Sequence, residues 1–309
     1  MDTPNGYWMP PAASTVAQSV DDLYFVIFWL CVVFFFIVTG GVVYFAYKYR
    51  RKHPDQLATQ QIGHNTLLEA TWTIIPAILV IWIFVLGFRV YMDLIVAPGD
   101  SLEYQVTAKQ WAWDFRDPDG CSVPGELHVP AGRPVKLTMR SDDVIHSFYI
   151  ADFRVKQDVL PGRYSSVWFQ ADKPGTHNIQ CTEYCGTSHS NMFAKVVVHT
   201  PEEFANRAQT FCKVTVGKEH GEKLYKNQCA ACHTIDGNRL VGPSFKGIWG
   251  REGKMSDGSK VIVDENYIVE SIRIPTAKVV EGYPPAMPAF PTLTNDDIAS
   301  IIEYMKTLK

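Results

Sequence analysis

The chain has 309 residues, with a formal net charge of -3 and hydrophobic side chains at 47% of its positions. This length is sufficient for two ordinary domains. The slight acidity argues against a nucleic-acid-binding protein, which usually carries a basic face. Because the mean hydropathy is nevertheless close to zero, we expect the apolar residues to be concentrated in one part of the chain.

Two long apolar segments lie near the N-terminus. Leu23–Tyr47 runs for about 25 residues without a charge, which is long enough to cross a bilayer with some tilt. The second segment, Trp72–Phe88, contains Pro76, which membrane helices tolerate; the alternative for this segment is a buried core helix. The first segment is too long for a cleaved signal peptide and has no basic n-region. We therefore predict two spans of a lipid bilayer.

Basic residues crowd the end of the first span, namely Lys48, Arg50, Arg51 and Lys52, whereas residues 1–22 contain no Lys or Arg. The positive-inside rule then places the loop between the spans in the cytoplasm and both termini outside. We expect the chain after about residue 95 to lie on the periplasmic side of a bacterial cytoplasmic membrane.

The segment from Leu102 to Thr200 is typical of short strands. Apolar and polar residues alternate over Val135–Met139, and turn-forming pairs such as Pro161-Gly162 recur between the strand candidates. This segment is predicted to form an all-β sandwich or small barrel.

The C-terminal part, Gly217–Lys309, has helical periodicity. Thr294 and Asp297 form a capping-box pattern before an apolar face made of Ile298, Ile301, Ile302 and Met305. The predicted organisation is an external tail (1–22), two spans with a cytoplasmic loop (23–94), a β domain (95–200), a linker (201–216) and a small α domain (217–309).

The β segment carries a dense set of metal-binding side chains: Cys181, Glu183, Cys185, His189 and Met192. Two thiolates on one loop can bridge two ions, and the imidazole and thioether that follow offer one terminal ligand to each. His146 is the candidate for a second imidazole. Soft ligands combined with imidazole select copper, whereas a zinc site of two Cys and two His would need no methionine. We predict a binuclear copper centre, with structural zinc or a Cys181–Cys185 disulfide as the alternatives.

The segment Leu23–Thr200 resembles subunit II of cytochrome c oxidase, in which two spans precede a cupredoxin-like domain with a binuclear CuA centre. The resemblance rests on the pattern His…Cys-x-Glu-x-Cys-x-x-x-His-x-x-Met. It implies the following copper ligands: His146, Cys181, Glu183 through its backbone carbonyl, Cys185, His189 and Met192. It also implies that the Glu183 side chain binds magnesium shared with the catalytic subunit.

The resemblance extends to three further segments. Gln110–Phe115 matches an aromatic patch above the copper centre. Trp111 occupies the position of the family's electron-entry residue; the alternative is that these aromatic side chains only pack at the end of the β-sandwich. Val155–Arg163 matches a segment near the interface with the catalytic subunit. Leu68–Pro76 matches the start of the family's second span. The resemblance implies that Glu69 lies at the cytoplasmic mouth of a proton channel; the alternative is a solvated residue at the start of a helix.

The α domain contains the sequence Cys229-Ala-Ala-Cys232-His233, the attachment motif for c-type haem. The two cysteines form thioether bonds in such sites, and the histidine is the proximal ligand. Thioredoxin-like and zinc sites can share the motif. The helical segment Glu219–Tyr225 before it and the amphipathic segment after Thr294 match class I cytochromes c.

The sixth ligand of the haem iron should be a methionine, because methionine and histidine together raise the haem potential. Met255 lies in a polar loop and Met305 on the apolar face of the last helix. Met287 lies on a proline-rich loop that resembles the M-P-x-F segment of small cytochromes c, so it is the preferred candidate.

The fusion of such a cytochrome c domain to subunit II resembles the caa-type oxygen reductases. The chain is then expected to be an electron-input subunit, passing electrons from cytochrome c or another respiratory complex through haem c and CuA to catalytic subunit I. That subunit would reduce dioxygen to water and translocate protons. The alternatives are the equivalent subunit of a nitric or nitrous oxide reductase, and a membrane-tethered electron shuttle without a catalytic partner.

Three cysteines remain outside these sites. Cys31 lies in the first span and is expected to be a small apolar filler. Cys121 and Cys212 could form a disulfide, but this depends on geometry that the sequence does not give. The histidines without ligand spacing are expected to be structural or surface residues: His128, His177, His199 and His220.

Overall fold

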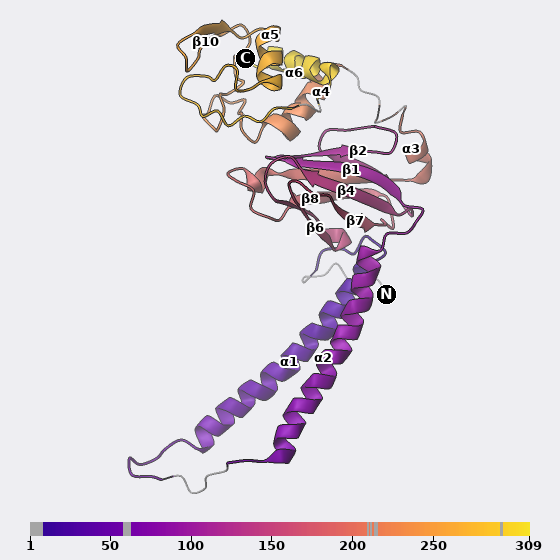
Figure 1. Ribbon diagram of the computed structural model, residues 1–309, viewed down its shortest axis with the longest axis vertical. Helices are drawn as coiled ribbons and strands as arrows, with labels where there is room; N and C mark the ends of the chain where they lie inside the picture. Colours follow the sequence, from indigo (N-terminus) through magenta and orange to yellow (C-terminus); the bar gives the residue numbers. More distant parts are fainter. Residues whose placement is uncertain (1–8, 58–62, 209, 211, 213–215, 291–292) are drawn as a thin grey trace. The chain divides into compact units, whose positions relative to one another are not determined.

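The computed structural model describes residues 9–57, 63–208, 210, 212, 216–290 and 293–309. The chain forms two compact units, one made of Val16–Val96 and the other of residues 1–15 and 97–309 (Figure 1). The first unit contains two long helices, and the second contains a β domain followed by a domain of short helices. The predicted fold class is therefore confirmed.

Both helices of the first unit are long and apolar enough to cross a bilayer; α1 is Ala17–Lys48 and α2 is Thr66–Ile95. Their most apolar stretches are not buried, so the alternative of a buried core helix is wrong for Trp72–Phe88. The Asn65 side chain caps α2 by accepting a hydrogen bond from the backbone N–H of Leu68 at 3.1 Å.

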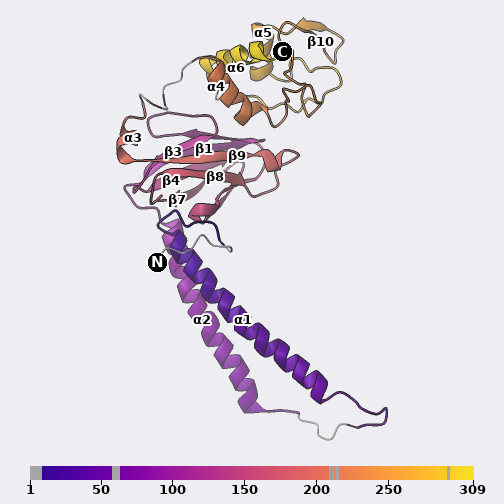
Figure 2. The ribbon, with the colours of Figure 1, turned by 180° about the vertical axis from the view of Figure 1, so that it is seen from behind.

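The β domain is a sandwich of two sheets with strand orders β2-β1-β4-β7 and β3-β9-β8-β5-β6 (Figure 2). Most neighbouring strands are antiparallel, but β1 pairs with β4 in parallel and β3 pairs with β9 in parallel. The strands are β1 Leu102–Lys109, β2 Ala112–Arg116, β3 Glu126–Pro130, β4 Val135–Ser141, β5 His146–Ile150, β6 Val155–Val159, β7 Ser165–Phe169, β8 Gly175–Cys181 and β9 Phe193–His199.

Alternate residues of these strands form the core between the sheets. In β4, Val135, Leu137 and Met139 are buried while the residues between them are not. The period of two places them all on one face of the sheet. Burial of such side chains stabilises the sandwich by roughly 1.5–3 kcal/mol each, which supports a rigid frame beneath the loops at the strand ends. The all-β prediction for this segment is confirmed.

The C-terminal domain is built on a close crossing of two helices, α4 (Lys218–Leu224) and α6 (Asn295–Thr307), which lie side by side in both views (Figures 1 and 2). A Cβ atom at Gly221 would collide with the backbone carbonyl of Ser300, so glycine permits this approach. The predicted capping box at Thr294 is present, and so is the predicted buried face of α6: Ile298, Ile301, Ile302 and Met305.

The remaining elements of this domain are short. They are a π-helical turn η3 (Tyr225–Cys229), a hairpin of β10 (Glu252–Lys254) and β11 (Lys260–Ile262), and helix α5 (Glu265–Arg273). Neither the hairpin nor α5 is predicted from the sequence. The local sequence signals for α5 are weak: the N-cap residue Asp264 and the apolar pair Ile268 and Ile272, four residues apart. Both isoleucines are buried in the structure.

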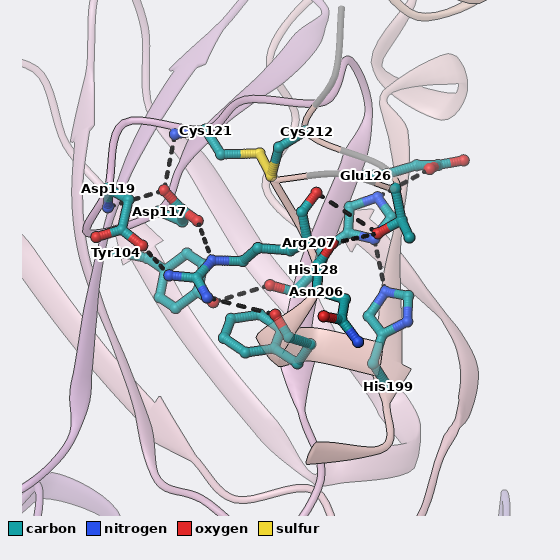
Figure 3. The surroundings of a disulfide bond; sticks show 12 residues. Tyr104, Asp117, Asp119, Cys121, Glu126, His128, His199, Asn206, Arg207 and Cys212 are labelled. Carbon is teal, nitrogen blue, oxygen red and sulfur yellow. Dashed lines mark hydrogen bonds and ion pairs between the residues drawn. A yellow bond between two sulfur atoms is a disulfide. The ribbon is translucent and has the colours of Figure 1, made fainter. Parts of the chain in front are cut away.

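A disulfide fastens the segment after the β domain to the β domain itself. Cys121 and Cys212 are bonded, which answers the question left open by the sequence (Figure 3). The short helix α3 (Pro201–Ala205) precedes it, and Arg207 forms ion pairs with Asp117 and Asp119 beside the bond. Residues 209, 211 and 213–215 of the predicted linker lie outside the described residues.

Candidate functional site

The predicted copper ligands converge on loops at one end of the five-stranded sheet. His146 is the first residue of β5, Cys181 is the last residue of β8, and the others lie on the loop between β8 and β9. Three of them, His146, Cys181 and Cys185, are buried and have ligand atoms within 4.8 Å of one another. The sheet therefore fixes both ends of the ligand loop.

The two thiols lie side by side at the centre of this site. Their Sγ atoms are 3.8 Å apart, far beyond the roughly 2.05 Å of a disulfide, so the disulfide alternative is wrong. Their contact lowers the pKa of Cys181 and raises that of Cys185, because one thiol stabilises the thiolate of the other. The Cys181 thiol also donates to the carbonyl of Glu183 at 3.3 Å, which brings the predicted carbonyl ligand to the same place.

His146 is held in an orientation that suits a metal ligand. Its Nδ1 lies 3.9 Å from the Cys181 sulfur, and its Nε2 lies 2.8 Å from Oδ1 of Asp143. Burial by itself would lower the pKa of His146, but hydrogen bonds with Asp143 and Cys181 raise it. A carboxylate on the distal nitrogen leaves the other nitrogen free for the metal. Sequence reasoning missed Asp143, although a carboxylate three residues before the histidine was a usable signal.

The other two candidates complete the donor set. The Nδ1 atom of His189 lies 3.4 Å from the Cys185 sulfur, and the sulfur of Met192 lies 3.8 Å from it. Two cysteine sulfurs, two imidazoles, a thioether and a carbonyl thus gather at one site, in which both cysteines, His146 and Met192 are buried. This donor chemistry fits a copper pair, because soft ligands combined with imidazole favour copper.

Trp111 touches the copper loop directly. Its indole N–H donates to the carbonyl of Cys185 at 3.1 Å, and the Gln110 amide donates to the same oxygen at 2.8 Å. Gly186, with φ +118°, makes room for both side chains, since a Cβ atom there would meet them at 3.0 Å or less. Trp113 differs, being only 1% exposed and packed edge-on against Phe148. The packing alternative thus describes Trp113.

The predicted haem residues line one largely apolar cavity of the C-terminal domain; they are Cys229, Cys232, His233 and Met287. The Nδ1–H group of His233 donates to the carbonyl of Pro243 at 2.7 Å, which leaves Nε2 available. Burial lowers the pKa of His233, which favours the neutral imidazole. A neutral, oriented imidazole beside two free cysteines fits covalently bound haem c.

Met287 is the methionine candidate that best fits the cavity. It is partly buried against the domain core, and its sulfur lies 3.9 Å from the Ser271 hydroxyl. Met305 also lines the cavity but belongs to the buried face of α6. Met255 is buried in a turn whose backbone bridges to Val280, and it is not among the described residues that line the cavity.

The two remaining predicted residues are exposed carboxylates. The Glu183 side chain is exposed on the copper loop, where a partner subunit could reach it. Glu69 lies in the first turn of α2, with Oε1 at 2.8 Å from Nδ1 of His64 and at 3.4 Å from the backbone nitrogen of Asn65. Both contacts are local to the start of the helix.

Comparisons with known proteins match three parts of the chain. Residues 2–90 match the family model for the cytochrome c oxidase subunit II transmembrane domain, residues 116–200 the model for its periplasmic domain, and residues 219–309 the cytochrome c model. A relative from Synechocystis sp., cytochrome c oxidase subunit 2, is 33% identical over 243 residues, covering 63% of this chain and 73% of the relative. The chain belongs to the cytochrome c oxidase subunit II family.

Other similar proteins carry the same description. Cytochrome c oxidase subunit 2 of Alkalihalophilus pseudofirmus is 31% identical over 276 residues, covering 85% of this chain and 79% of the relative. The periplasmic domain of subunit II of cytochrome oxidase from Bradyrhizobium japonicum is 31% identical in a solved structure. That match covers 37% of this chain and 96% of the other, with a TM-score of 0.36. In this chain, a cytochrome c domain follows the periplasmic domain of subunit II.

Proposed function

We propose that this chain is the electron-input subunit of a haem–copper terminal oxidase, an oxidoreductase whose oxygen-reducing site lies in catalytic subunit I. The observation that carries the proposal is the clustering of candidate ligands for a copper pair and, separately, for haem c, in a chain of the subunit II family. Bound there, the two groups supply one-electron chemistry between an external donor and the catalytic subunit.

The chain's own residues hold these groups and limit their rearrangement. The copper pair would be held by His146, Cys181, the carbonyl of Glu183, Cys185, His189 and Met192. Haem c would be held by Cys229, Cys232, His233 and Met287. Asp143 orients His146, and the Pro243 carbonyl orients His233, at 2.8 and 2.7 Å. Fixed orientations of this kind keep a site similar in its two redox states, which favours fast electron transfer.

Trp111 is one residue through which electrons reach the copper loop. Its hydrogen bond to the Cys185 carbonyl and its place in the lining of the haem cavity support this role. Glu183 binds magnesium shared with subunit I through its exposed side chain. Glu69, at the start of α2, lies at the entrance of a proton channel into subunit I.

The chain is membrane-anchored through α1 and α2. The basic residues after α1 support a location of the copper and haem domains on the periplasmic side of a bacterial cytoplasmic membrane. The donor there is cytochrome c or another respiratory complex. Because haem c is tethered to the copper domain, transfer between the two does not depend on a diffusing carrier.

Purification through a tag on this chain, followed by metal analysis and EPR and optical spectra, tests the proposal. A mixed-valence copper signal together with haem c and two a-type haems is expected. Haem c and copper without another haem would instead indicate an electron shuttle. A b-type haem with non-haem iron would indicate a nitric oxide reductase.

A further inference from the structure

A hydrogen bond joins the haem attachment loop directly to the copper ligand loop. The hydroxyl of Ser188 donates to the backbone carbonyl of Ala231 at 2.8 Å. Ser188 immediately precedes the copper ligand His189, and Ala231 lies between the two haem cysteines. Ser188 is only 5% exposed, so water does not compete for this contact.

An ion pair of the copper domain contacts the haem domain at a second point. Asp114, on β2, accepts from the Gln228 amide at 2.9 Å through Oδ1 and pairs with Lys109 at 2.9 Å through Oδ2. Gln228 directly precedes the first haem cysteine, and the ammonium group of Lys109 lies over the Phe290 ring. Lys109 is only 4% exposed. A buried ammonium group that loses its carboxylate partner is left poorly solvated, so this contact resists opening.

A third contact lies on the other side of the haem attachment turn. The amide of Asn227 donates to the carbonyl of Pro124 at 2.8 Å. The three polar contacts come from the residues around the haem cysteines, and they reach three separate segments of the copper domain. Together they fix the position of this turn on the copper domain.

We propose that the hydrogen bond from Ser188 to Ala231 is an electron bridge between the two loops, and that Asp114 positions the loops for it. The bridge is continuous: covalent bonds lead from Cys232 to the Ala231 carbonyl, one hydrogen bond crosses to Ser188, and covalent bonds lead on to His189. Electronic coupling falls off less steeply through bonds and hydrogen bonds than through a gap between atoms. The inference rests on the proposed function.

With haem c held by His233 and copper held by Cys181 and Cys185, the step would move one electron from the haem to the copper pair. The haem would be oxidised and the copper pair reduced, each by one electron. No covalent bond forms or breaks, and Ser188 keeps its proton. Trp111 offers a parallel contact, so the contributions of the two must be separated by experiment.

The test uses the purified complex, in which haem c is photoreduced without oxygen and the arrival of the electron at copper is followed by absorbance. Ser188→Ala should slow this transfer several-fold, both alone and in a Trp111→Phe background. Ser188→Thr, which keeps a hydroxyl, should restore most of the rate. Ser190→Ala is the matched control, because Ser190 is an exposed serine of the same loop.

Three further readouts separate a bridge from a structural effect. The copper EPR spectrum and the two reduction potentials should not change in Ser188→Ala. Asp114→Asn should slow the transfer and also speed hydrogen exchange in residues 225–233, because the loops separate more often. An unchanged rate in Ser188→Ala, or a slower rate with an altered copper spectrum, would overturn the bridge. The proposed function would survive both results, but absence of transfer in the unaltered complex would contradict it.

Discussion

The indole N–H of Trp111 and the backbone carbonyl of Cys185 are joined by a hydrogen bond of 3.1 Å, which places an aromatic ring against the copper ligand loop. The same ring contributes to the lining of the haem cavity. Trp111 therefore contacts both candidate redox sites of the chain.

Replacement of Trp111 by phenylalanine removes this hydrogen bond and keeps an aromatic ring. We expect slower reduction of the copper pair and a retained copper EPR spectrum, because none of the copper ligands is changed. Stopped-flow absorbance of the purified complex measures the rate. Trp113→Phe is the control for packing, since Trp113 lies in the core; it should lower thermal stability more than it lowers the rate. Equal rates in Trp111→Phe and the unaltered complex would remove Trp111 from the pathway.

Met287→Leu should abolish the absorption band of the methionine–iron bond and lower the reduction potential of haem c, because leucine cannot bind iron. Optical spectra and redox titration of the purified chain provide the measurement. Met255→Leu is a matched control, since Met255 lies outside the described lining of the cavity. Survival of the band in Met287→Leu would transfer the ligand role to Met305 or Met255.

The disulfide between Cys121 and Cys212 closes a loop of 91 residues. In the chain-entropy model, a loop of this size contributes roughly 4–5 kcal/mol to stability. The double variant Cys121→Ala, Cys212→Ala should therefore unfold at a clearly lower temperature in a thermal scan. A reductant should then destabilise the unaltered protein but not the variant. Cys31→Ala, at a free cysteine of α1, should leave the transition unchanged. A reductant-insensitive unaltered protein would contradict this account.

The C-terminal domain should lose stability in acid through Asp297. Burial would raise the pKa of this carboxyl, but hydrogen bonds with His220 and the backbone of Thr294 outweigh it and lower the pKa. A lowered pKa in the folded state gives stability that is present above the ordinary value of 3.8 and is lost as the pH falls through the folded value.

Asp297→Asn should therefore cost about 1 kcal/mol at neutral pH, similar to the loss of a helix cap, and should flatten the pH dependence as the pH falls below about 4. Urea unfolding of the purified chain, followed by haem absorbance at several pH values, measures this effect. Asp296→Asn is the control, because the neighbouring Asp296 is exposed. The same pH slope in both variants would exclude Asp297 as the cause.

Sites built from local spacing could be predicted from the sequence. The ligands from Cys181 to Met192 lie on one short loop, and Cys229, Cys232 and His233 lie close together in the sequence. The chemistry of both sites can therefore be inferred from the sequence alone. The capping box at Thr294 and the buried face of α6 are local in the same sense.

Features that depend on distant segments could not be predicted. The disulfide joins cysteines 91 residues apart, and only the packed sandwich brings them together. Ser188 and Ala231 carry no sequence signal, because a serine hydroxyl and a backbone carbonyl are common and their meeting depends on tertiary structure. The hairpin of β10 and β11 is too short for its alternation to stand out.

Electrons are expected to pass within this chain from the haem site to the copper site. The most direct test of this transfer is to add one electron equivalent to the purified, oxygen-free complex and to follow the haem c and copper absorbance together. The account predicts that haem c is reduced first and then loses the electron to copper, at a rate independent of protein concentration. A rate that rises with concentration, or haem c that keeps its electron, would contradict it.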